Sequence, residues 1–163
     1  MNERSATRAS HNPLTRHLRE VAQSLGGDDL CELGLAEPAF VWLFGSTMVE
    51  ACIDPAGRVE LKAFLVHGPV SRDEVATDLA LFSAGLVIGE LRLDDDGDVV
   101  MMHRVPARAT TQRIAEQVET FCQEADRLDD IVSARLGGER ALDRLQSTIL
   151  RALRLSTDGA LPS

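Results

Sequence analysis

The part of the sequence best suited to cation binding is an acidic run, Asp94-Asp95-Asp96-Gly97-Asp98. Hard cations such as Ca²⁺ take several carboxylate oxygens, and an EF-hand loop places a glutamate at its twelfth position. This chain has no glutamate at that spacing, and strand-like rather than helix-like sequence flanks the run. The pattern therefore favours a solvated hairpin turn over a metal site.

The histidines and cysteines also lack the spacing of a metal site. None of the four histidines has a Cys, Asp or His at ligand spacing, and the cysteines never form a C-x-x-C pair. These residues are His11, His17, His67, His103, Cys31, Cys52 and Cys122. We interpret Cys52 and Cys122 as small buried apolar residues. No metal ligand and no cofactor is predicted.

Nucleophilic and acid–base chemistry find little support either. Gly45-Ser46 lacks the flanking G-x-S-x-G pattern of a nucleophile elbow, and no glycine-rich phosphate loop is present. Glu50 and Glu60 lie on strand-like segments, where paired carboxylates usually turn into water. We therefore predict no catalytic residue and do not expect an enzyme.

Apolar surface is the remaining candidate for function. Phe40, Trp42 and Phe44 share one parity, so a single strand would place them on one sheet face. Val41 and Leu43 would lie on the other face, and both faces would then need a cover. Either the helices of the chain cover both, or one face meets a partner chain or a peptide.

Periodicity predicts the elements that position these residues. Helices are expected over 13–25, 71–84 and 110–135, and strands over 39–44, 47–53, 58–67, 87–93 and 99–105. A last amphipathic segment covers 139–153. The fold class is therefore α+β, a twisted antiparallel sheet with helices in the order α-β-β-β-α-β-β-α plus a C-terminal amphipathic helix.

The helix over 110–135 carries an apolar stripe with steps of three and four residues. We interpret the stripe as core or as a dimer seam, with the sheet edge at 99–102 as a second dimer candidate. The stripe residues are Ile114, Val118, Phe121, Ala125 and Leu128.

Composition narrows the class of partner. The chain has 163 residues, a formal charge of −9 and 44% apolar residues. A nucleic-acid surface needs clustered Lys and Arg, and no apolar run reaches the roughly 18 residues of a membrane helix. We expect a cytoplasmic protein that binds neither nucleic acid nor membrane.

The order of elements and several motifs resemble the type III secretion chaperone-like superfamily, and within it the YbjN-type proteins. The similarity lies in 79–85 ending a helix, in the hairpin 89–100, in Val105-Pro106 and in the helix over 110–135. It covers roughly residues 13–136. The usual asparagine-rich end of the middle helix is here Phe82-Ser83-Ala84-Gly85, and 139–153 has no counterpart. The resemblance implies an often homodimeric domain that holds an extended segment of another protein.

Together these observations predict a non-enzymatic, chaperone-like homodimer that binds a polypeptide client or partner protein. The alternative is a regulatory or sensory domain that binds a small molecule or controls another protein. We expect tails at 1–12 and 156–163, the chaperone-like domain at 13–136 and the C-terminal helix at 137–155. The predicted partner-binding residues are Phe40, Trp42, Phe44, Met48, Leu14 and Leu18.

Overall fold

The computed structural model describes residues 13–25, 31–33, 39–68, 72–106 and 108–158. Within these ranges the helices are α2 (Pro13–Ser24), α3 (Arg72–Ala84), α4 (Thr111–Leu136) and α5 (Ala141–Asp158). The expected tail at 1–12 and residues 159–163 of the second expected tail lie outside the described residues. Helix α5 continues through Asp158, three residues past the segment expected to contain it.

The described strands form one antiparallel sheet in the order β1-β2-β3-β4-β6-β5, which confirms the predicted α+β class. The strands are β1 (Cys31–Leu33), β2 (Ala39–Phe44), β3 (Thr47–Ile53), β4 (Val59–Val66), β5 (Glu90–Leu93) and β6 (Val99–Val105). Strand β1 is an addition to the expected order. Strand β6 lies between β4 and β5, so the expected sheet edge at 99–102 is wrong and β5 forms that edge.

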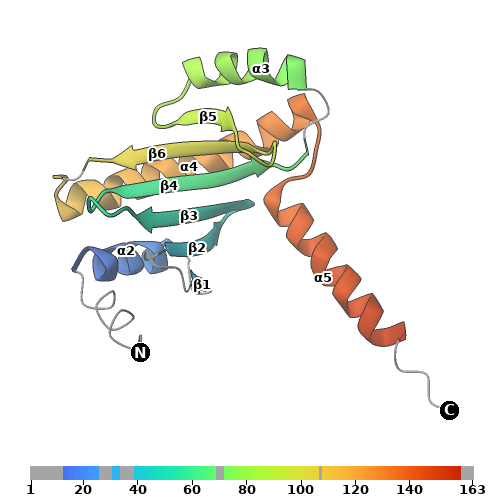
Figure 1. Cartoon of the computed structure of the whole chain (residues 1–163), viewed down its shortest axis with the longest axis horizontal. Coiled ribbons are helices and arrows are strands. Elements are labelled where there is room, and N and C mark those ends of the chain that lie inside the picture. Colours follow the sequence, from blue (N-terminus) through green and yellow to red (C-terminus); the bar gives the residue numbers. More distant parts are fainter. Residues whose placement is uncertain (1–12, 26–30, 34–38, 69–71, 107, 159–163) are drawn as a thin grey trace.

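Helix α4 lies behind β4 and β6 in Figure 1, α2 lies beside β2 at the lower edge, and α3 lies beyond β5 at the upper edge. Thr110 caps α4 by accepting a 3.3 Å hydrogen bond from the backbone N–H of Arg113. Gly137, with a φ of 70°, ends the same helix. A positive φ favours glycine at this position, because glycine carries no Cβ to clash.

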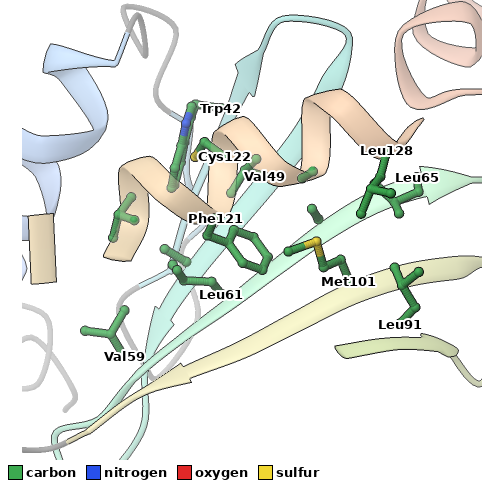
Figure 2. Packing of buried hydrophobic residues seen from close by; sticks show 14 of the residues in the cluster. Trp42, Val49, Val59, Leu61, Leu65, Leu91, Met101, Phe121, Cys122 and Leu128 are labelled. Atoms are coloured by element: carbon green, nitrogen blue, oxygen red, sulfur yellow. The ribbon is translucent and has the colours of Figure 1, made fainter. Parts of the chain in front are cut away.

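The core lies between α4 and the sheet, as Figure 2 shows. Every second residue of β3 and β4 is buried, so one face of each strand packs on the helix. The predicted stripe of α4, from Ile114 to Leu128, lies in this core. Phe121 is fully buried at its centre, and its ring stacks on that of His103 with centroids 6.4 Å apart. We call this side of the sheet the helix face and the opposite side the open face.

Candidate functional site

Three of the predicted partner-binding residues lie inside the core of the chain. Phe40, Trp42 and Leu18 expose 0%, 2% and 0% of their surface. The Trp42 indole lies beside the Cys122 thiol under α4 (Figure 2). Burial raises the pKa of this thiol to about 12, so it stays protonated at neutral pH.

The other three predicted residues occupy different surroundings. Phe44 and Leu14 are half-buried and pack against the core cluster on the helix face. Met48 pairs with Leu43, whose parity is opposite to that of Trp42, so Met48 lies on the open face. The structure therefore divides the predicted set between two faces of the sheet.

The open face carries an apolar row that runs across four strands. The pairing register places Leu43 beside Met48, Met48 beside Phe64 and Phe64 beside Val100. Leu43 exposes 38% of its surface, while Met48 and Phe64 are half-buried. With strands about 4.8 Å apart, the row spans about 14 Å. In Figure 1, α4 lies on the other side of these strands, and α5, which contacts β3 and β4, begins beside the end of β4.

A second row on the open face contains the charged residues. From β2 to β5 it holds, in register, Val41, Glu50, Lys62, Met102 and Glu90. Residues two apart on a strand share a face about 6.7 Å apart. A segment lying on the apolar row would therefore bring its flanking side chains to these charges.

A groove of about 550 Å³ opens over the second row and beside the β5–β6 turn, and Val100 is the member of the apolar row that lines it. Val100 and Met102 lie at its floor, where they expose only 1% and 9% of their surface. Lys62 also lines the groove. Its ammonium group lies 4.5 Å from the centroid of the Phe64 ring and 3.4 Å from Asp94 Oδ2. Lys62 is also the only lysine in the sequence.

The acidic run forms the turn of the β5–β6 hairpin, and Asp94 organises it. Its Oδ1 accepts hydrogen bonds of 3.0 Å from the backbone N–H groups of Asp96 and Asp98. Partial burial alone would raise the pKa of Asp94. The hydrogen bond from the Asp98 N–H and the Lys62 ammonium outweigh burial and hold the pKa below its ordinary value.

At neutral pH, Asp94→Asn should lower the free energy of unfolding by about 1 kcal/mol, because the turn loses a charged acceptor. The folded pKa lies below the unfolded one, so ionised Asp94 contributes stability above about pH 4, and this contribution disappears as the pH falls through the folded pKa. Urea unfolding at pH 7 and pH 3 should therefore show a difference from wild type that narrows at pH 3.

The matched control is Asp96→Asn, which removes the same charge from an exposed side chain of the same turn. This variant should unfold like the wild type at both pH values. Equal losses in the two variants would show that net charge, rather than the geometry of Asp94, sets the stability of the turn.

The two described histidines in strand-like sequence have structural partners. His67 Nδ1 lies 2.8 Å from Asp98 Oδ2, and His103 Nε2 lies 2.7 Å from Gln117 Oε1. Among the described residues, no group of three or more His, Cys, Asp or Glu side chains is placed to hold a metal ion. Nor does any described helix combine the length and apolar character needed to cross a membrane.

A contact that the sequence did not reveal holds the β2–β3 turn to α4. The backbone N–H of Ser46 donates to Asp126 Oδ1 at 3.0 Å, and its hydroxyl donates to Asp129 Oδ2 at 2.5 Å. A Cβ on Gly45, whose φ is 58°, would lie 2.0 Å from Asp126 Oδ1. The one local signal was Gly45-Ser46 itself, which marked a turn but not its partner.

The outer side of α3 is apolar although no described element covers it. Val75 and Leu79 face inward and are buried, and Asp78 pairs with Arg135 of α4 at 3.3 Å. The outward residues are exposed: Ala76, Thr77, Ala80, Leu81 and Ala84. Leu81 exposes 69% of its surface, and Val87 just beyond the helix exposes 79%. A helix that is apolar on both sides usually packs on both sides.

These features define a class: an α+β domain whose sheet is covered by helices on one face and carries an apolar row and a charged row on the other. The chain belongs to the T3SS (YopN, CesT) and YbjN peptide-binding chaperone 1 family, whose model matches residues 40–144. This confirms the resemblance found in the sequence. No match was found among curated protein sequences.

Solved structures share the fold at low sequence identity. A chain in the crystal structure of the ExsC–ExsE complex has 20% identity and a TM-score of 0.56, over 72% of this chain and 91% of that chain. The HopA1–SchA chaperone–effector complex gives 12% identity and a TM-score of 0.51, over 73% and 98%. YbjN from E. coli has 14% sequence identity and a TM-score of 0.49, over 71% of this chain and 91% of that chain.

Proposed function

We propose that this protein is a non-enzymatic chaperone-like module that holds a segment of a partner polypeptide on the open face of its sheet. The observation that carries the proposal is the apolar row across β2, β3 and β4, in which Leu43 exposes 38% of its surface and Met48 and Phe64 are half-buried. Membership in a peptide-binding chaperone family supports the same function. Uncovered apolar surface of this kind usually marks an interaction site.

The proposed site keeps Met48 from the predicted set and adds its neighbours in the row. Phe40, Trp42 and Leu18 are buried in this structure, so a partner would reach them only after α2 or α4 moved. A role for Phe44 and Leu14 in binding stays a prediction. We further propose that residues 13–136 form the binding unit and that α5 is an addition to it.

We also propose that the protein is a homodimer that forms through the outer side of α3. Ala76, Ala80 and Ala84 recur every four residues and so form one stripe of small side chains. Leu81 and Val87 extend this stripe with exposed apolar surface. A two-fold axis through the stripe would let two α3 helices approach closely and bury both leucines.

Replacing Leu43 by glutamate should weaken binding of an unfolded polypeptide at least about tenfold, because it places a charge in the apolar row. The probe is fluorescently labelled α-lactalbumin, reduced and carboxymethylated so that it stays unfolded, and binding is measured by fluorescence anisotropy.

The matched control is Ile131→Glu, at a position on α4 with 44% exposure, and it should bind like the wild type. The proposal would be wrong if the wild type failed to bind the unfolded probe. Equal affinity of the Leu43 and wild-type proteins would move the site away from the open face.

A further inference from the structure

The groove on the open face is lined by more acidic than basic side chains, and only some of the acidic side chains have a partner within the chain. Four carboxylates line it, together with two cationic side chains. The carboxylates belong to Glu50, Glu60, Asp94 and Asp95, and the cations to Lys62 and Arg92. The formal charges of the lining side chains alone therefore sum to −2 at neutral pH, two positive groups against four negative groups.

Two of these carboxylates are already neutralised by partners within the chain. Glu60 accepts a 2.7 Å hydrogen bond from Arg104, and Asp94 holds Lys62 and the turn. The side chains of Glu50 and Asp95, by contrast, have no ion-pair or hydrogen-bond partner among the described residues. The carboxylates available to a partner are thus those on β3 and at the tip of the turn.

The position of Glu50 relates this charge to the apolar row. Glu50 lies two residues from Met48 on the same face of β3, about 6.7 Å along the strand. A segment whose apolar side chains cover Met48 and Phe64 would place its flanking side chains beside Glu50. An acidic flank there would meet an unpaired carboxylate, whereas a basic flank would form an ion pair.

We propose that the open face receives an amphipathic polypeptide segment in which apolar side chains are flanked by arginine or lysine. This inference rests on the proposed function and specifies the chemistry of the segment. The apolar row supplies contact area, and Glu50 and Asp95 select the charge of the flanks. Acidic segments of the same apolar pattern are rejected, because Glu50 repels them.

Lys62 gives a direct report of occupancy, since it is the only lysine and lies beside the row. The probes are two short N-acetylated peptides with the same leucine pattern, one flanked by arginine and the other by glutamate. Neither contains an amine. Acetylation of Lys62 by an N-hydroxysuccinimide ester is followed by mass spectrometry of the proteolytic peptide that contains Lys62, which separates it from acetylation of the N-terminal amine. The arginine peptide should slow it in proportion to its occupancy, and the glutamate peptide should not.

A pair of variants separates the groove from the general acidity of the protein. Glu50→Arg should weaken binding of the arginine peptide about tenfold. Glu119→Arg makes the same change in charge at an exposed position of α4, on the far side of the molecule, and should leave the affinity unchanged. Equal losses in both variants would overturn the inference, because long-range attraction would then explain the binding.

The remaining outcomes distinguish this inference from the proposed function. If unfolded α-lactalbumin binds at Leu43 but the glutamate peptide competes as well as the arginine peptide, the charge preference is wrong and the function stands. If neither the protein probe nor the peptides bind, both are wrong. If acetylation of Lys62 slows with protein concentration alone, a second copy occupies the open face and the inference is overturned.

Discussion

Shortening Phe121 to alanine should remove about 3–5 kcal/mol from the free energy of unfolding. The ring is fully buried between α4 and the sheet, among side chains such as Leu61 and Met101 (Figure 2). Its loss leaves a cavity that the surrounding strands cannot close, since their register is fixed by pairing on both sides of β4. The expected loss is a large share of the 5–15 kcal/mol by which a domain of this kind is typically stable.

Urea unfolding followed by the fluorescence of Trp42, the only tryptophan, measures this effect. Gln123→Ala truncates an exposed side chain on the same helix and should change the free energy by less than about 0.5 kcal/mol. A loss below about 1 kcal/mol in Phe121→Ala would mean that the core is packed differently around α4.

Ala80→Arg should convert the proposed homodimer into a folded monomer. An arginine in the middle of the alanine stripe holds two α3 helices apart, so Leu81 and Val87 lose their partner surface. Because Ala80 is exposed in the single chain, the substitution should leave the circular dichroism spectrum unchanged. Light scattering across a concentration series should show a dimer dissociation constant raised at least about 100-fold.

Gln123→Arg introduces the same side chain on an exposed face of α4, and it should dimerise like the wild type. A wild-type protein that is monomeric at every concentration would remove the dimer from the proposal. A dimer that survives Ala80→Arg would place the interface on another surface.

The sequence predicted most of the elements, because strong periodicity marks them. The stripe from Ile114 to Leu128 identified α4 and placed it within one residue of each of its ends. Alternation also separated Trp42 from Leu43 correctly by parity. It could not say which parity α4 would cover, since β2 is apolar on both sides. The predicted binding set therefore mixed residues of the helix face with Met48 of the open face.

Features that depend on contacts between distant parts of the sequence could not be predicted from local sequence patterns. Strand β1 has three residues, too few for a periodicity, and its existence depends on pairing with β2. The position of β6 inside the sheet follows from its pairing with β4, which lies more than 30 residues earlier. The contact of Ser46 with Asp129 likewise joins residues 83 positions apart. The position of Glu50 beside the apolar row likewise follows from the strand register, which the sequence alone did not predict.

His67 joins three segments of the chain, and this bears on how the protein can be shortened. Its backbone exchanges hydrogen bonds of 2.8 and 2.9 Å with Glu139, and its side chain reaches Asp98 in the hairpin turn. A Cβ on Gly138 would lie 2.5 Å from the His67 carbonyl oxygen, so the backbones of these two segments are in close contact. A fragment cut at the glycine pair would leave the end of β4 unpaired. Truncations and fusion joints are therefore better placed inside α5, beyond Ala141.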